Sequence, residues 1–441
     1  MNSKNITLEK QIGFADTLPD TIRKKARKNA IFSALFGCIS EQAIDTNTLL
    51  ILYLVMLGGN DSFSMFSTAI SGLAFAVLSI PSAGLVDRWG LRKSYSWAIY
   101  AQALMLFIIA AAPWTGRFAV SAVIGAFTIF CILRTFYAAT WFPIVDNFLK
   151  ADERGPFFGT MRFVYMNFNM FLIFGVGYLM GDEPPLLIIQ SYFAIAALGL
   201  LGRKFFLDKL PMSTDRKTRK IEILPALKIS IRNNALVCFS IYYGFLNMAA
   251  LAAMPLAVIY MKNFLHLSSS TIMLITATGI LGQIIGFSLI GRLTQKLGIG
   301  YFELLTHLLF VLAIGLLIFT SRENTFNSCT LGTAFFLNGM ASAFLICIGS
   351  IEMLALARPG NKVMAMAFVS TFQYLGNALG RAGSSLILAL GIFAPVWNFG
   401  GYEFSYFHTI FILNSAIILL GLILLMIVPA ASRNRENYYE P

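Results

Sequence analysis

Charged side chains are scarce in this sequence. Only 12% of the 441 residues are charged, whereas a soluble domain carries about a quarter. Apolar residues make up 57% of the chain, and its mean hydropathy is +0.73. Because so few charged groups are present, most of the protein's surface does not face water. This excludes an ordinary soluble protein.

The signatures of catalysis, nucleotide binding and metal binding are also missing. The sequence has no Walker loop, no His-Glu-x-x-His pattern and no serine elbow, so we expect neither an enzyme nor a chain that is driven by its own ATP site. No cofactor or metal is expected, because the few cysteines stand singly and show no metal-ligand spacing. The cysteines are Cys38, Cys131, Cys238, Cys329 and Cys347. The segment before about residue 30 is polar, so no cleavable signal peptide of the usual form is predicted.

Long apolar stretches are what the sequence has instead. A helix needs about 20 apolar residues to cross a bilayer, and such stretches recur from about Ala30 to about Ala430. We therefore predict an all-α membrane protein with twelve transmembrane helices. The predicted spans are 30–57, 62–86, 94–113, 118–145, 156–181, 185–205, 229–260, 269–290, 300–320, 326–355, 363–393 and 404–430.

Basic residues are distributed unevenly among the predicted loops. Most of the 33 lysines and arginines lie before the first span, after the sixth span, in alternate short loops and in the C-terminal tail. The other loops hold only Arg117, Lys262 and Arg322. The positive-inside rule places the basic side in the cytoplasm, so we expect both termini there, in a multi-pass protein of the bacterial inner (plasma) membrane type. Because this topology accounts for the net charge of +12, no nucleic acid partner is expected.

An internal repeat divides the predicted spans into two pseudo-symmetric bundles of six helices. The sequence from Ala83 to Gly90, after the second span, is echoed at positions 291–298, after the eighth. Asp146 and Glu352 end the fourth and tenth spans in the same way. Parallel six-helix repeats are a common plan of transporters, with the binding site at their interface. The predicted tail, first bundle, linker loop, second bundle and tail are 1–29, 30–205, 206–228, 229–430 and 431–441.

The loop after the second span carries a family resemblance. Its sequence Leu85-Val86-Asp87-Arg88-Trp89-Gly90-Leu91-Arg92-Lys93 resembles the signature of the major facilitator superfamily (MFS), Gly-x-Leu-Ala-Asp-Arg-x-Gly-Arg-Arg/Lys. Two positions depart from the pattern: Ala83 replaces the first glycine, and Leu91 replaces the first arginine of the closing pair. The resemblance implies the MFS fold and a secondary transporter, without identifying the subfamily.

The same loop has a physical interpretation of its own. Gly90 permits a tight turn, and Arg88 or Arg92 is able to pair with Asp146. The resemblance implies that such contacts lock the two halves in the outward-facing state, whereas the alternative is a basic loop that only sets the topology. The residues assigned to this gate are Asp87, Arg88, Gly90, Arg92, Asp146, Lys296 and Glu352.

Three charged residues are predicted within spans that line the central cavity in this superfamily. Glu41 and Asp45 lie one helical turn apart near the middle of the first span, and two close carboxyl groups resist ionising together. We predict that they couple transport to protons, with sodium as the alternative ion. Arg134, near the middle of the fourth span, is expected to face them. The alternative is a buried salt bridge that only fixes the two helices.

Further polar residues are predicted to contact a substrate. Gln373, Asn377 and Arg381 follow one another at intervals of four and form one polar stripe, which must face protein or a wet cavity. Interhelical hydrogen bonding is the alternative role of this stripe. The predicted substrate-binding residues are Arg134, Arg381, Gln373, Asn377, Asn247, Arg162 and Asn169.

The excess of arginine over acid in the predicted core favours a small solute with an anionic group, such as an organic acid, an amino acid or a phosphorylated metabolite. We expect a proton-coupled symporter that works by alternating access as a monomer in the lipid bilayer. A multidrug/proton antiporter is the main alternative, although Gly175-Val176-Gly177 lacks the proline of the antiporter motif in the fifth helix. A transporter-like sensor is a distant alternative.

Overall fold

The protein is almost entirely helical. A computed structural model describes residues 14–45, 47–150, 153–181, 184–212, 223–321, 327–358, 361–399 and 402–427. The first half contains α1 (Phe14–Thr17), α2 (Asp20–Asp45), α3 (Thr48–Met56), α4 (Asp61–Trp89), α5 (Leu91–Ala111), the 3-10 helix η1 (Ala112–Phe118), α6 (Ala119–Val145), α7 (Arg154–Met180) and α8 (Leu186–Leu207). The second half contains α9 (Ile223–Ile231), α10 (Asn234–Ala250), α11 (Ala253–Asn263), α12 (Ser269–Ile318), α13 (Asn327–Leu356), α14 (Lys362–Leu390), β1 (Val396–Phe399), β2 (Tyr402–Ser405) and α15 (Tyr406–Ile427).

The predicted all-α membrane class is confirmed. Within the described residues, nine helical segments are long and apolar enough to cross a membrane, and one of these, Leu91–Val145, contains both α5 and α6. The predicted spans 30–57 and 363–393 correspond to α2 with α3 and to α14, which do not meet the same criterion of length and composition. The count of twelve spans therefore stays a prediction.

Two predicted spans are interrupted. The first is split into α2 and α3 at Asn47, whose φ of 57° is left-handed. The seventh is split into α10 and α11 at Leu251 and Ala252. Pro255 explains the second break, because a proline has no N–H for the carbonyl of residue 251 and its ring crowds that carbonyl in a continuous helix.

Two predicted loops also differ from expectation. The helix α12 runs through residues 291–299, where a loop was predicted between the eighth and ninth spans. The segment before the last span forms an antiparallel hairpin, in which Val396 pairs with Ser405 and Phe399 with Tyr402. The predicted linker 206–228 is described at 206–212 and 223–228, and much of both predicted tails lies outside the described residues.

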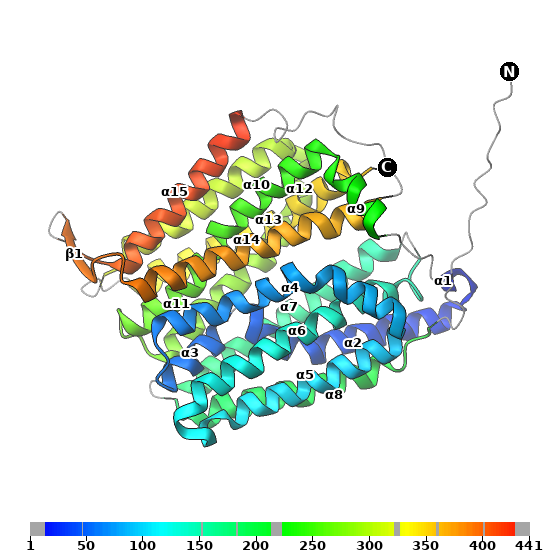
Figure 1. Ribbon diagram of the computed structural model, residues 1–441, viewed down its shortest axis with the longest axis horizontal. Coiled ribbons are helices and arrows are strands. Elements are labelled where there is room, and N and C mark those ends of the chain that lie inside the picture. Colours follow the sequence, from blue (N-terminus) through cyan, green and yellow to red (C-terminus); the bar gives the residue numbers. More distant parts are fainter. Residues whose placement is uncertain are drawn as a thin grey trace.

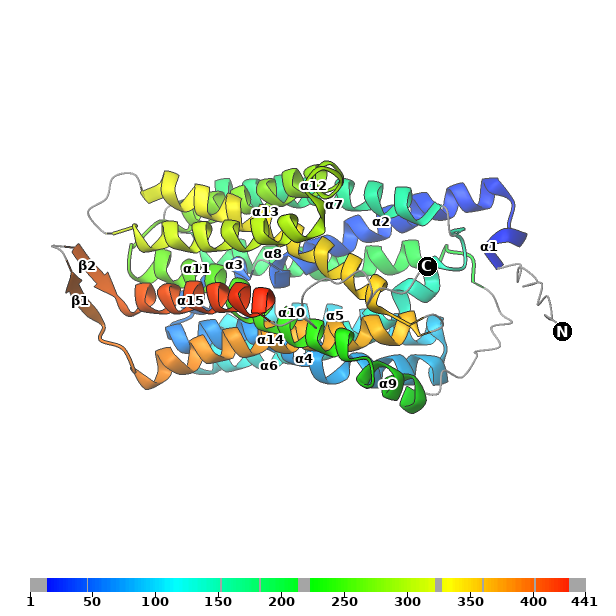
Figure 2. The same ribbon diagram turned by 90° about the horizontal axis from the view of Figure 1, so that it is seen from above.

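The helices of the first half and most helices of the second half lie on opposite sides of the molecule (Figure 1). The two sets meet where α4 packs against α14 and where α7 packs against α12, and Figure 2 shows the first of these pairs from above. At the α4–α14 contact, a Cβ on Gly72 would lie 3.0 Å from the carbonyl oxygen of Tyr374. A residue without a side chain therefore allows this close approach. The bundle boundaries 30–205 and 229–430 remain a proposal.

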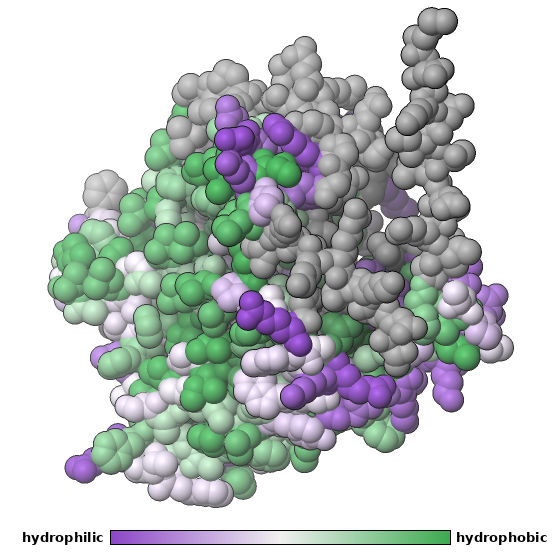
Figure 3. Space-filling view, turned by 45° about the vertical axis from the view of Figure 1, so that its right-hand side comes forward, coloured by the Kyte–Doolittle hydropathy of each residue, from purple (hydrophilic) through white to green (hydrophobic). Residues whose placement is uncertain are grey.

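The outer surface is rich in large apolar side chains. Phe171, Leu187 and Leu198 are each more than half exposed, and Figure 3 shows apolar residues over much of one face, with hydrophilic residues gathered mainly toward its right-hand side. A surface of this kind is stable against lipid tails but not against water. The backbone of each helix also suits lipid, because its hydrogen bonds are satisfied internally.

Candidate functional site: a central cavity lined by arginine and amide side chains

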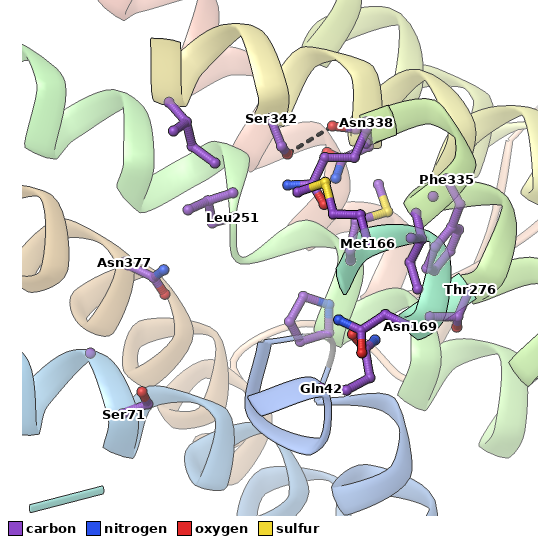
Figure 4. A pocket seen from close by; sticks show the side chains of 18 of the residues that line it. Gln42, Ser71, Met166, Asn169, Leu251, Thr276, Phe335, Asn338, Ser342 and Asn377 are labelled. Atoms are coloured by element: carbon purple, nitrogen blue, oxygen red, sulfur yellow. Dashed lines mark hydrogen bonds between the residues drawn. The ribbon is translucent and has the colours of Figure 1, made fainter. Parts of the chain in front are cut away.

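A cavity of about 430 Å³ lies where helices of the two halves face one another. The polar and aromatic side chains around it come from α2, α4, α6, α7, α12, α13 and α14, and Figure 4 shows several of them. They are Gln42, Ser71, Arg134, Arg162, Tyr165, Asn169, Thr276, Gln283, Phe287, Phe335, Asn338, Ser342, Tyr374, Asn377 and Arg381. The lining thus contains three arginines, and among the described residues that line it there is no Asp or Glu.

Arg134 of α6 is paired with Glu41 of α2, as the sequence predicted. Its Nε donates to Glu41 Oε2 at 3.0 Å, and its Nη2 contacts the same oxygen. Nη1 lies 3.4 Å from the hydroxyl of Ser71 on α4. The side chain of Asp45, the other predicted coupling acid, lies outside the described part of the structure.

Glu41 has a second cation that sequence reasoning missed. Arg203 of α8 donates from Nη1 to Glu41 Oε1 at 2.8 Å, and its guanidinium lies 4.6 Å from the ring centre of Tyr137. The predicted sixth span ended at residue 205, and Arg203 was counted with the basic linker. In the structure α8 continues to Leu207, so Arg203 faces the interior of the bundle and is buried. Both carboxylate oxygens of Glu41 therefore accept from a guanidinium group.

Arg381 of α14 lines the cavity and ties three segments together. Its Nη1 donates to the carbonyl oxygen of Thr68 on α4 at 2.8 Å, and its Nε donates to the carbonyl oxygen of Leu251 at 3.3 Å. The Leu251 carbonyl is available because Pro255, four residues later, cannot donate to it. These two carbonyl oxygens orient the guanidinium group.

Amide side chains form the second group of the lining. The Oδ1 atoms of Asn169, Asn338 and Asn377 are buried and have no hydrogen-bond partner. A buried polar atom without a partner is rare in native proteins, and an unseen water or ligand often explains it. Asn338 was not singled out from the sequence, although its position within the predicted tenth span was a signal for it.

Two of the predicted substrate residues are not part of the lining. Gln373 shares the polar stripe with Asn377 but does not reach the cavity. Asn247 is fully buried in α10, and its Nδ2 donates to the carbonyl oxygen of Tyr243 one turn earlier. This hydrogen bond holds the Asn247 amide against its own helix. Arg162 does line the cavity, and its side chain lies 5.6 Å from the ring centre of Phe287 on α12.

The predicted gate residues lie near the ends of α4, α6 and α13, at the start of α5 and in the middle of α12. Gly90 makes the expected turn, with φ 85°, and both caps α4 and precedes α5. Arg88 and Arg92 are exposed. Lys296 is exposed and Glu352 is buried, whereas the side chain of Asp87 lies outside the described part.

A cluster of ion pairs lies near this end of α6. Arg23 of α2 donates to Glu153 at 2.8 Å and also contacts Asp20, and Arg27 lies 3.5 Å from Glu153. The hydrogen bond and the charge of Arg23 lower the pKa of Asp20 below its usual value. The start of α2 is thereby fastened to the segment between α6 and α7.

Polar contacts between the halves gather at the opposite end of the bundle. Asp61, the first residue of α4, accepts from the hydroxyl of Tyr406 at 2.9 Å and from the amide of Asn263. Ser62 and Ser385 exchange hydrogen bonds through their hydroxyl and carbonyl groups at 2.9–3.0 Å. We call these five residues the end latch. Among the described residues, no group of three His, Cys, Asp or Glu side chains is arranged to hold a metal ion.

Comparison with known proteins shows which family and which solved structures this chain resembles. Residues 235–440 match the sequence model of the Major Facilitator Superfamily. The nucleoside transporter NupG has a similar structure, with 14% identity, a TM-score of 0.70, and coverage of 94% of this chain and 100% of that one. A POT family transporter in complex with a thioalcohol-conjugated peptide shares 13% identity and a TM-score of 0.65, over 92% of this chain and 96% of that one.

A third similar structure is that of a bacterial homologue of the iron transporter ferroportin in an inward-facing state. It has 13% identity, a TM-score of 0.64, and coverage of 93% of this chain and 99% of that one. At these identities the likeness shows a shared fold and nothing about the solute. No curated protein sequence matches this chain.

Proposed function

We propose that this chain is a membrane transporter of the major facilitator type and that it carries a small organic solute with an anionic group by secondary active transport, in line with the family match over residues 235–440 and the shared fold. The observation that carries this proposal is the charge of the cavity. Three guanidinium groups face it, and no acid belongs to the described lining.

The two deep arginines differ in their partners. Arg134 pairs with Glu41, and Arg381 donates to the carbonyl oxygens of Leu251 and Thr68. Both line the cavity, where a carboxylate or phosphate group would accept from them, and hydrogen bonds between a guanidinium and an anion are about twice as strong as neutral ones. Arg162 adds a third cation on the opposite side, from α7.

The amide groups suit the rest of such a solute. The unpartnered Oδ1 atoms of Asn169, Asn338 and Asn377 are acceptors that hydroxyl or amine groups would satisfy. Tyr165, Phe287 and other aromatic rings supply apolar contact. An organic acid, an amino acid or a phosphorylated metabolite meets these requirements.

Glu41 gives this site a means of coupling to a cation. While ionised, it neutralises part of the charge of Arg134 and Arg203. A proton on Glu41 would release Arg134 to bind the solute, so proton and anion would enter together. Sodium is the alternative ion, and Asp45 is proposed as the second acid of this coupling site.

Alternating access would open and close the two ends of the bundle in turn. The end latch holds one end closed through Asp61 and Ser62, and the predicted gate residue Gly90 lies at the other. We infer that the cavity is reached from the end that carries Gly90, which the distribution of basic residues assigns to the cytoplasm.

A ligand screen by thermal unfolding of the purified protein tests this proposal. Organic acids, amino acids and phosphorylated metabolites would each be compared with a neutral amide or alcohol analogue, at two pH values. A ligand at a hundred times its Kd stabilises the folded state by about 2.7 kcal/mol. We expect stabilisation by one class of anion, lost in Arg381→Gln and retained in the control Arg117→Gln, which changes an arginine outside the cavity.

The opposite result has a clear meaning. Stabilisation by lipophilic cations and not by anions, lost in Glu41→Gln, would overturn the anion proposal and favour the multidrug/proton antiporter. Stabilisation by an anion that persists in Arg381→Gln, Arg134→Gln and Arg162→Gln would show that the cavity is not the binding site.

A further inference from the structure

A second buried carboxyl group lies in the other half of the molecule. Glu303 and His307 are one turn apart on α12, within the candidate span Gly300–Ile318, and Tyr242 of α10 faces both. Glu303 is 2% exposed, His307 is fully buried and Tyr242 is 7% exposed. All three are described residues, and none lines the cavity. An ionisable group within a span is costly and points to a function.

The hydrogen bonds of His307 fix one of its two ring protons. Its Nδ1 lies 2.9 Å from the backbone carbonyl oxygen of Glu303. A carbonyl oxygen only accepts, so the hydrogen of this contact must be on Nδ1. In a neutral imidazole the other nitrogen, Nε2, then carries no hydrogen and can only accept.

The contacts of Tyr242 require one more proton than its hydroxyl group supplies. This hydroxyl lies 2.9 Å from Glu303 Oε1 and 3.0 Å from His307 Nε2. Each contact needs one hydrogen between its heavy atoms, and a tyrosine has only one to give. The second hydrogen must therefore reside on the Glu303 carboxyl or on His307 Nε2.

Both arrangements leave the pair of titratable side chains with no net charge. In the first, Glu303 is a neutral acid that donates to the Tyr242 oxygen, and Tyr242 donates to neutral His307. In the second, Tyr242 donates to the Glu303 carboxylate and accepts from an imidazolium. One proton moves from Glu303 to the Tyr242 oxygen while another moves from Tyr242 to Nε2, so the two forms interconvert without loss of a proton. Removing that proton leaves the pair with one negative charge inside a candidate span.

The surroundings of the trio are mostly aromatic. The Tyr242 ring stacks on the His307 ring with centroids 5.9 Å apart, and Phe239 lies 6.3 Å from Tyr242. The titratable groups in contact with Glu303 include Tyr242 of α10 and His307 of α12 itself. Tyr243, the next residue of α10, directs its hydroxyl to the carbonyl oxygen of Leu345 on α13 instead.

We propose that Tyr242, Glu303 and His307 form a proton-binding site in the second half of the transporter, separate from the cavity and from Glu41. The site holds one exchangeable proton among side chains of α10 and α12 and releases it in a single step as the pH rises. This inference stands on the hydrogen-bond arrangement of the trio and does not depend on which solute is carried.

Nitrogen NMR of the 15N-histidine-labelled full-length protein tests the site directly, with pH as the only variable. The chain has three histidines, and His408 provides an internal reference. Its Nδ1 accepts from the backbone N–H of Ser405 at 2.9 Å and its Nε2 lies 3.0 Å from the carbonyl oxygen of Thr320. His408 is therefore the tautomer with hydrogen on Nε2, the reverse of neutral His307.

We expect His307 to keep hydrogen on Nδ1 at every pH at which the fold persists, and to lose one proton together with Glu303 in a single step. Infrared spectra recorded across this step should show the loss of either the band of a protonated carboxyl group or the signal of an imidazolium. In Glu303→Gln, the amide N–H replaces the acid proton, so His307 should stay neutral and the step should disappear. The matched control Glu352→Gln, which changes another buried acid of this half, should leave the step unchanged.

A second variant separates the proton site from a general effect of burial. Tyr242→Phe removes the bridging hydroxyl and should split the single step into independent changes of Glu303 and His307, whereas Tyr243→Phe should not. Hydrogen on Nε2 alone in neutral His307, or an ionised Glu303 beside a neutral His307 at every pH at which the wild type is folded, would overturn the proposal. If anions fail to stabilise the protein but the proton is still lost in a single step, the result would count against the proposed anion cavity and not against the proton site.

Discussion

Glu41 and Glu303 are both carboxyl groups inside helical bundles, but their partners differ in kind. Glu41 receives guanidinium groups from α6 and α8 on its two oxygens, whereas Glu303 faces a tyrosine hydroxyl that is shared with a histidine. An arginine does not lose its proton in a protein, so the cations around Glu41 are permanent. In the proposed site, Glu303 shares with Tyr242 and His307 a proton that can leave. Permanent cations thus keep a carboxyl group ionised, whereas a partner that shares a proton allows the charge of the carboxyl group to change.

The same substitution at both acids should give the largest contrast. Glu41→Gln leaves the buried guanidinium of Arg203 and the partly buried one of Arg134 without their anion and is expected to cost about 3–5 kcal/mol of stability. Glu303→Gln keeps the hydrogen-bond pattern of a neutral acid and is expected to cost about 1 kcal/mol. Unfolding of both variants in mixed micelles measures the two losses, and equal losses would remove the distinction between the acids.

The second cation of Glu41 offers a smaller test. Arg203→Met leaves Arg134 as the only guanidinium on Glu41 and should cost about 2–3 kcal/mol, the value of a hydrogen bond to a charged group. Combined with Glu41→Gln, the loss should be smaller than the sum of the two single losses by about 1–3 kcal/mol. Lys204→Met on the same helix is the control, since its partner Asp208 is partly exposed and such a pair contributes at most about 1 kcal/mol. Additive losses in the double variant would contradict the direct pairing.

The smallest effect is expected at the tyrosine bridge. Tyr242→Phe removes one neutral hydroxyl and should cost about 1 kcal/mol at acid pH, where Glu303 keeps a proton. The cost should be larger at alkaline pH, because the ionised Glu303 then lacks its donor. Thermal unfolding at the two pH values checks this, with Tyr243→Phe as the control that should cost about the same at both. A pH-independent cost for Tyr242→Phe would mean that Glu303 does not change its charge.

The contact between Arg134 and Glu41 could be predicted from their positions within apolar stretches. The contact of Arg203 could not, because its helix extends beyond the expected end of the span. Arg134 and Glu41 were paired correctly, because each lies deep within an apolar stretch and charges there must find partners. Arg203 was missed, as its position near the end of an apolar stretch made it look like part of a basic linker. Its true partner lies 162 residues away, and no local pattern encodes that distance.

Glu303 and His307 illustrate a signal that was present but not used. Both lie within the predicted span 300–320 at a spacing of four, which puts them on one helix face. Tyr242, on a different helix, could not be attached to them from the sequence. Asn247 and Gln373 show the reverse error, since polar residues at cavity-like positions of a helix also bond to their own backbone or face a neighbouring helix.

The sequence by itself determined that this protein is helical and lies in a membrane, because hydropathy and the spacing of apolar residues depend only on local composition. It also determined the turn at Gly90 and the break before Pro255, which follow from the backbone limits of single residues. Only the tertiary structure decided which charges meet. The packing of helices that are distant in the sequence joins Glu41 with Arg203, Arg381 with Thr68, and Tyr242 with Glu303. That packing gives Glu41 permanently charged partners and gives Glu303 partners that share a proton.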